Sequence, residues 1–292
     1  LAQEIGALAD WTEGATHVTG GRMNEALASF DLAEAGFRRL GLPGPAAQTR
    51  VPRIIALTML GRHADAAECG EQVKQEFLQQ GDRLAAGKVS HNLGSLSMRR
   101  EAYAVAARHY REAAVLFART RSAEPSVMSD IGLADALTSM GDFNEALRIY
   151  ARARMRAQQY HLAVPQVLVD ESVALLDLAR GQYRDALTGF EAARQGYERL
   201  AMPQHLAIAE KQLADAYLAL SLLPEALHLF DAAQAQFQRL EMPYERAWTL
   251  AQIGRTRALM GEADGALQAL DAAMALFAEQ GNAVGQAAVR LA

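Results

Sequence analysis

Alanine recurs seven times in this chain at one constant interval, and this period constrains the fold more than any other feature. The anchor alanines occupy every fortieth position: Ala26, Ala66, Ala106, Ala146, Ala186, Ala226 and Ala266. A fixed period between roughly 20 and 50 residues is the signature of a stacked repeat array. Such an array has no single globular core, because each repeat buries its apolar face against its neighbours. The period therefore predicts a solenoid and favours a binding surface as its function.

The residues around each anchor repeat as well, and they predict two helices per period. The fifth position before the anchor suits a tight turn and is occupied by Gly21, Gly61, Glu101, Gly141, Gly181, Ser221 and Gly261. Ala146, Tyr150 and Ala153 then follow at i, i+4 and i+7, which is one face of an α-helix. We expect one array over residues 1–292, with about seven helix pairs. Their approximate bounds are 1–41, 42–81, 82–122, 123–162, 163–202, 203–242 and 243–282, and 283–292 begins a further helix.

Composition excludes several classes of protein. Hydrophobic residues make up 51% of the 292 residues, so the chain is expected to fold. An apolar run of about 18 residues is absent, which argues against a membrane span. The net charge of −5 disfavours direct binding of nucleic acid. The single cysteine, Cys69, excludes an internal disulfide and favours a reducing, cytoplasmic setting.

Chemistry-bearing motifs are missing from the sequence. The seven histidines are scattered without metal-ligand spacing, and the glycines fall at the repeat period instead of forming a phosphate-binding loop. An order of serine, histidine and aspartate that could form a triad is also missing. We therefore expect a non-catalytic protein with no catalytic residue, no metal site and no cofactor.

The pattern within each period resembles the tetratricopeptide repeat. The resemblance rests on Leu93-Gly94, Leu133-Ala134 and Leu213-Ala214 in the first helix of a pair, and on Ala186, Phe190 and Ala193 in the second. The period of this chain is longer than the family's usual 34 residues. This long-helix variant is similar to the arrays of kinesin light chain, LGN/Pins-type adaptors, and CHAT-associated or MalT/LuxR-associated proteins. The resemblance implies an all-α, right-handed superhelix whose concave face is lined by the first helix, called helix A, of each pair.

That geometry places two helix-A positions of each repeat in a groove, the fifteenth and the eleventh before the anchor. With the neighbouring Asn92, the polar residues of the central repeats give a candidate peptide-binding set of His91, Asn92, Ser95, Asp135, Glu171, Lys211, Asp215 and Arg255. A polar groove of this kind would hydrogen-bond an extended or helical peptide. The alternative is a solvated helix face, which the i,i+4 pair of Lys211 and Asp215 supports.

The sequence thus predicts a scaffold that binds a protein or peptide and contacts neither nucleic acid nor membrane directly. One alternative is a sensory or regulatory module for a covalently attached effector outside this chain, either a CHAT-type protease or a LuxR-type DNA-binding domain. A second alternative is a self-assembling array.

Two local features carry their own predictions. Arg148, Arg152 and Arg156 share one face of a second helix and are interpreted as a solvated outer face or a contact for a neighbouring domain. Pro52 falls inside a first helix, where it removes a backbone hydrogen bond, and Gly70 replaces the usual aromatic of that pair. Residues 43–80 are therefore predicted to bend locally or to be more mobile than other repeats.

Overall fold

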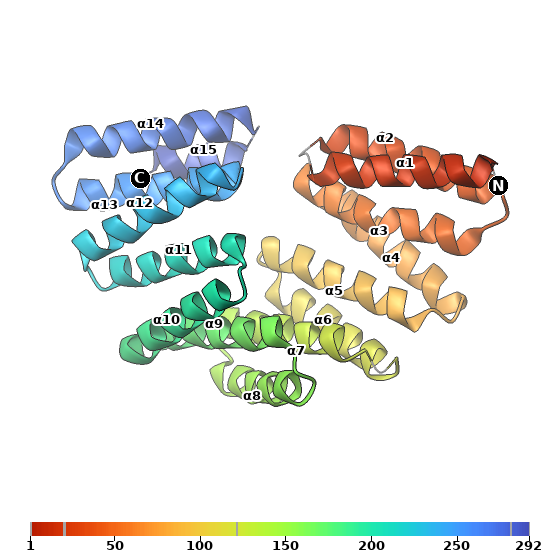
Figure 1. The fold of residues 1–292 in the computed structure, drawn as a ribbon, viewed down its shortest axis with the longest axis horizontal. Helices are drawn as coiled ribbons and strands as arrows, with labels where there is room; N and C mark the ends of the chain where they lie inside the picture. Colours follow the sequence, from red (N-terminus) through yellow and green to blue (C-terminus); the bar gives the residue numbers. More distant parts are fainter. Residues whose placement is uncertain (1, 20–21, 121, 281, 292) are drawn as a thin grey trace. The chain divides into compact units, whose positions relative to one another are not determined.

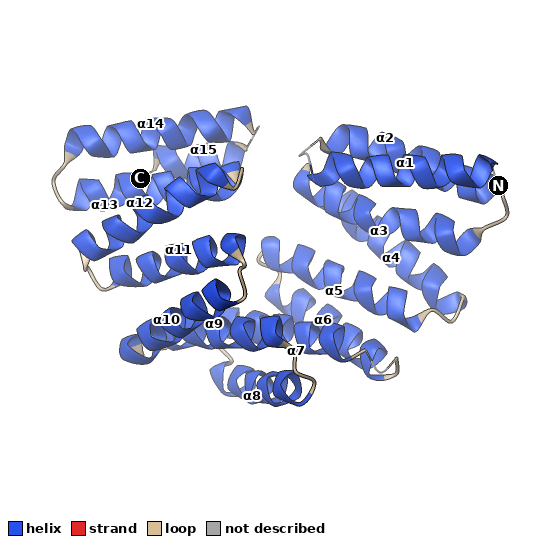
Figure 2. Cartoon of the chain, in the orientation of Figure 1, coloured by secondary structure: helices blue, strands red, loops and turns tan. Residues whose placement is uncertain are grey.

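The fold is entirely α-helical over the part of the chain that is described. A computed structural model describes residues 2–19, 22–120, 122–280 and 282–291, which form fifteen helices and no strand (Figures 1 and 2). The contacts divide the chain into two compact units, Leu1–Pro165 (unit 1) and Gln166–Ala292 (unit 2). The predicted all-α repeat architecture is confirmed. The prediction of one continuous array concerns how the two units join, and it stays a prediction.

Unit 1 contains four helix pairs, drawn from red to green in Figure 1. Their bounds are α1 Ala2–Thr19, α2 Met23–Arg39, α3 Pro43–Met59, α4 His63–Gln79, α5 Arg83–Arg99, α6 Tyr103–Ala118, α7 Ala123–Ser139 and α8 Phe143–Gln159. Each helix packs on the next one in the chain. The first helices of neighbouring pairs also pack directly on one another, α1 on α3, α3 on α5 and α5 on α7. The odd-numbered helices therefore form a continuous surface.

Unit 2 continues the same alternation from the first turn of α9. Its helices are α9 Ala163–Ala179, α10 Tyr183–Arg199, α11 Pro203–Ala219, α12 Leu223–Arg239, α13 Pro243–Leu259, α14 Ala263–Glu279 and α15 Ala283–Arg290. Here too the first helices α11 and α13 contact each other. Within the described residues, no helix is both long enough and apolar enough to cross a membrane.

The helices end at a turn that recurs twice in each period of the sequence. Positive φ angles occur at Gly41, Gly61, Gly81, Glu101, Gly141, His161, Gly181, Ala201, Ser221, Glu241 and Gly261. At Gly141, with φ of 81°, the Gly141 N–H donates to Thr138 O and the Asp142 N–H donates to Leu137 O. These two bonds form a Schellman motif, which satisfies the last carbonyls of the helix. The predicted turn positions are confirmed except Gly21, which lies outside the described residues.

The anchor alanines lie at helix contacts, as their spacing predicts. Six of the seven are completely buried, and Ala266 is 4% exposed. Large aromatic side chains fill the space beside them, and Phe30, Phe190 and Phe230, at the fourth position after the anchors, are buried. Glycines on helix A make room for such rings: a Cβ atom at Gly94 or Gly132 would lie 2.7 or 2.6 Å from the ring of Tyr110. The repeat therefore pairs small residues on one helix with large ones on the next.

Two of the three arginines on this face of α8 form ion pairs with the neighbouring helix, which the prediction of a solvated face did not include, and the contact with a neighbouring domain stays a prediction. Arg152 and Arg156 both donate to the carboxylate of Asp130 on α7, at 2.7 and 3.2 Å. Arg156 also donates to Ser126. Asp130 is 1% exposed, so the arginines neutralise a buried charge. Arg148 matches the prediction of a solvated face, because it is exposed and pairs with Glu145 on its own helix.

Candidate functional site

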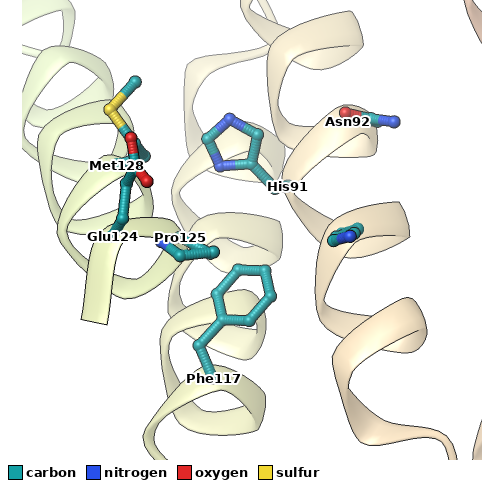
Figure 3. A pocket seen from close by; sticks show the side chains of 7 residues that line it. His91, Asn92, Phe117, Glu124, Pro125 and Met128 are labelled. Carbon is teal, nitrogen blue, oxygen red and sulfur yellow. The ribbon is translucent and has the colours of Figure 1, made fainter. Parts of the chain in front are cut away.

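A pocket opens on the helix-A surface of unit 1, between α5 and α7 (Figure 3). It has a volume of about 280 Å³ and is open to solvent. We call it the α5–α7 pocket. It is lined by Lys88, His91, Asn92, Phe117, Glu124, Pro125 and Met128. Phe117 comes from α6 and is fully buried, so it forms the floor between the two first helices. The pocket combines an apolar floor with polar groups from both walls.

His91 stands at the centre of the pocket, directed from α5 towards α7 (Figure 3). Its Nδ1 atom lies 3.1 Å from Ser129 Oγ on α7, and its ring meets the Tyr110 ring edge-on with centroids 5.2 Å apart. Burial lowers the pKa of His91. The imidazole is therefore neutral at pH 7, where it can both donate and accept a hydrogen bond.

Tyr110 fixes the wall behind His91. Its hydroxyl lies 3.1 Å from Ser95 Oγ, and the Ser95 hydroxyl also donates to the backbone oxygen of His91 at 3.3 Å. Burial raises the pKa of Tyr110 to about 12. The phenol therefore keeps its proton at pH 7. The hydroxyl of Ser95 thus makes its hydrogen bonds inside the repeat, where it connects Tyr110 to the backbone of His91.

Asn92 and Lys88 lie one turn apart on α5. The amide of Asn92 is half-buried, and Lys88 is exposed. Neither side chain has a hydrogen bond or an ion pair with any described residue of the protein. Both groups are therefore available to a bound molecule.

The remaining predicted residue of unit 1, Asp135, lies on α7 and serves the same kind of internal bond as Ser95. Its Oδ1 atom accepts a hydrogen bond of 2.6 Å from the hydroxyl of Tyr150 on α8. Tyr110 and Tyr150 thus each contact, through the hydroxyl, the residue 15 positions earlier, on the first helix of the same pair. The structure brings His91, Asn92 and Ser95 together on α5 and places Asp135 on the next first helix.

Three of the four predicted residues of unit 2 form hydrogen bonds within the protein, and two of them, Lys211 and Asp215, bond each other. Lys211 donates to Asp215 at 2.6 Å, and the Gln252 amide donates to the other oxygen of Asp215 at 3.1 Å. Glu171 is buried and accepts the hydroxyl of Tyr197. Arg255 is exposed and lines a second pocket of about 260 Å³ with Trp248, Ala251, Gln252 and Ala288. Lys211 and Asp215 thus form the i,i+4 pair that the alternative expected, and a contact of either residue with a peptide stays a prediction.

Sequence reasoning missed Lys88, Phe117, Glu124, Pro125 and Met128. Lys88 and Met128 occupy the same place in successive repeats, one helical turn before the predicted groove positions. Extending the predicted face by that turn would have found them. Glu124 and Pro125 come from the first turn of α7, and their approach to α5 depends on how neighbouring pairs pack.

Comparisons with known proteins give the class of fold. No family model matches the sequence, and no curated protein matches it either. Among solved structures, aspartyl phosphate phosphatase F from Bacillus subtilis superposes with a TM-score of 0.73 at 9% identity, over 94% of this chain and 71% of its own. A Rap protein complexed with competence and sporulation factor gives 0.68 at 15%, over 99% and 81%. A tetratricopeptide repeat protein from Parabacteroides merdae gives 0.58 at 12%, over 98% and 99%.

At these identities the likeness concerns the fold alone. The chain has the all-α repeat fold of tetratricopeptide-type proteins, as its residue pattern predicted.

Proposed function

We propose that this protein is a non-catalytic scaffold that binds a peptide segment of a partner through the helix-A surface of unit 1. The observation that carries the proposal is the α5–α7 pocket, which lies at the predicted residues His91 and Asn92. An apolar floor surrounded by a few polar groups is the usual composition of a ligand site.

The two kinds of lining group would do different work. Phe117, Pro125 and Met128 offer apolar surface for one side chain of the ligand. The amide of Asn92 can donate to and accept from a peptide bond, and it has no competing partner among the described residues. Removing one such partner from a buried bond costs roughly 1–3 kcal/mol, which is about a five- to hundredfold change in affinity.

One solved structure with a similar fold contains a bound factor, which supports a ligand-binding role. The solved Rap protein mentioned above has the same helical arrangement and is in complex with competence and sporulation factor. A quorum sensor, NprR from B. thuringiensis, also shares the fold, with a TM-score of 0.56 at 12% identity. We extend the ligand-binding role to this chain because of its pocket.

A peptide selection tests the proposal. The full chain is used to select binders from a phage library of short random peptides, and their affinities are measured by fluorescence anisotropy. Met128→Lys places a long charged side chain in the pocket and is expected to weaken binding at least tenfold. Asn92→Ala is expected to weaken it about five- to hundredfold.

Met155→Lys is the matched control, because Met155 is exposed on α8 and lies outside the pocket lining. The control should bind like the unmodified chain. Selected peptides whose affinity is the same for Met128→Lys and for Met155→Lys would contradict the proposal. The regulatory-module and self-assembly alternatives stay predictions.

A further inference from the structure

Two unlike charges border the α5–α7 pocket from opposite helices. Lys88 projects from α5, and Glu124 lies in the first turn of α7. Both side chains are exposed, and neither forms an ion pair with the other or with any described residue. Each can therefore pair with a charge on a ligand without first breaking a bond inside the protein.

Several other charged side chains of unit 1 form ion pairs with side chains of another helix. Arg53 pairs with Asp31, Lys74 pairs with Glu112, and Arg152 pairs with Asp130. Lys88 and Glu124 come from opposite walls of the pocket, α5 and α7, and the apolar ring of Phe117 from α6 forms the floor between those helices. In Figure 3, Glu124 and Met128 lie on the α7 side, with His91 and Phe117 towards the middle of the pocket. A ligand that crosses from α5 to α7 thus meets positive charge, apolar surface and negative charge in that order.

The size of the pocket limits what its floor can hold. Sites that enclose drug-sized ligands have roughly 300–1,000 Å³. The α5–α7 pocket is slightly smaller, at about 280 Å³, and it is open. It therefore suits one large apolar side chain of a longer segment whose neighbouring residues run over the two walls.

We propose that the pocket selects peptide segments in which one large apolar residue is flanked by an acidic residue over α5 and a basic residue over α7. This inference rests on the proposed peptide-binding function and specifies the ligand. The apolar residue supplies most of the affinity, because exposed ion pairs contribute little. The flanking charges supply the discrimination, because a like charge at either wall is repelled.

Five peptides that differ only at the two flanking positions test the inference. They carry an acidic and a basic residue in either order, two acidic residues, two basic residues, or two neutral residues around the same leucine, in a sequence taken from the selection. Their affinities for the full chain are measured at low and at high salt. At low salt the mixed-charge peptide, in one of its two orders, is expected to bind roughly three- to tenfold more tightly than either like-charged peptide. High salt should remove this difference and leave binding of the neutral peptide unchanged.

Single charge reversals sharpen the test. Lys88→Glu should make the peptide with two basic residues the best ligand, and Glu124→Lys should do the same for the peptide with two acidic residues. The double variant with both reversals should favour mixed charge again, in the opposite order along the peptide. Arg83→Glu on α5 and Glu25→Lys in the first turn of α2 are matched controls, because both residues are exposed and lie outside the pocket lining. The controls should keep the original preference.

These measurements distinguish failure of the charge selection from failure of the proposed peptide binding. The charge selection would be overturned if all charged peptides bound the unmodified chain with equal affinity. It would also be overturned if the Lys88→Glu and Glu124→Lys variants kept the preference of the unmodified chain. Either result would leave peptide binding in place. If neither the neutral nor any charged peptide binds, the proposed function itself is wrong.

Discussion

The second and fourth helix pairs of unit 1 depart from the repeat pattern at complementary places. In α3–α4 the aromatic at the fourth position after the anchor is replaced by Gly70, whereas the later aromatic, Phe77, is kept and buried. In α7–α8 the first aromatic, Tyr150, is kept and buried, and the later one is replaced by Ala157. Each pair thus retains one of two large side chains, and the protein fills the other space differently.

The two pairs also differ in what lies near the missing aromatic, an apolar side chain in α3–α4 and a buried ion pair in α7–α8. A Cβ atom at Gly70 would lie 2.6 Å from the Leu93 side chain, so leucine from α5 occupies that space. Beside Ala157, Arg156 and Arg152 reach back to the buried carboxylate of Asp130. Both pairs therefore keep the repeat fold with one large aromatic in place of two.

Both pairs also carry an ion pair with the same sequence spacing but opposite polarity. Arg50 on α3 pairs with Glu76 on α4, whereas Asp130 on α7 pairs with Arg156 on α8. Glu210 and Gln236 on α11 and α12 repeat the spacing with a neutral donor. The geometry of the pair thus fixes where polar groups meet, and the sign of each charge is free to vary.

The largest effect is expected where the one retained aromatic is removed. Phe77→Ala and Tyr150→Ala should each destabilise the chain by roughly 3–5 kcal/mol, because the neighbouring space has no second ring to rearrange into the cavity. Denaturant unfolding of the full chain measures this. A cost below about 1 kcal/mol for either variant would mean that the two pairs do not depend on their remaining rings.

A smaller effect, of opposite sign, is expected at Pro52. The proline lies inside α3 and lacks the N–H that would bond the preceding turn. Pro52→Ala should therefore stabilise the second pair by up to about 3 kcal/mol. Pro243→Ala is the matched control, since Pro243 occupies the first turn of α13, where no N–H bond is lost.

Hydrogen exchange reports this difference locally. In the unmodified chain, amides of residues 43–80 should exchange faster than those of residues 123–159, and Pro52→Ala should reduce the gap. Equal protection of the two segments in the unmodified chain would contradict the prediction that the second pair is the weaker one.

The charged network of the fourth pair should contribute less than its rings. Asp130→Ala removes the acceptor of two arginines and should cost about 1.5–3 kcal/mol, because Arg152 and Arg156 are partly exposed and can turn to water. Arg148→Ala, which breaks an exposed pair within one helix, should cost less than about 0.5 kcal/mol. A double-mutant cycle of Asp130 and Arg156 isolates their coupling, and additive costs would show that the network does not stabilise the pair.

The smallest effect is a pH dependence of stability. Burial lowers the pKa of His91 and of His109 in the folded chain below the ordinary value of 6.5. As pH falls below about 6.5, the unfolded chain takes up protons before the folded chain does, so the free energy of unfolding decreases. Denaturant unfolding at several pH values between 7.5 and 5 measures the slope. His91→Asn should reduce it, and an unchanged slope in that variant would contradict the role given to burial of His91.

The fold followed from the sequence because its signals are local and periodic. Ala146 and Tyr150 report one helix face, and Gly141 reports the turn before it, so the helix pairs could be placed without tertiary information. The candidate site followed only in part. His91 was found because it occupies an expected groove position, whereas Glu124 reaches the pocket through the packing of α7 on α5. The bond between Asp130 and Arg156 could not be predicted, because it depends on the register in which α7 and α8 cross.

Hydrogen exchange with and without a selected peptide tests the central claim most directly. We expect the peptide to slow amide hydrogen exchange in α5 and α7, residues 83–99 and 123–139, and to leave exchange in α13 unchanged. We also expect that Met128→Lys abolishes the added protection and that Met155→Lys does not. Protection confined to other helices, or protection of α5 and α7 that persists in Met128→Lys, would contradict the claim that the α5–α7 pocket binds the peptide.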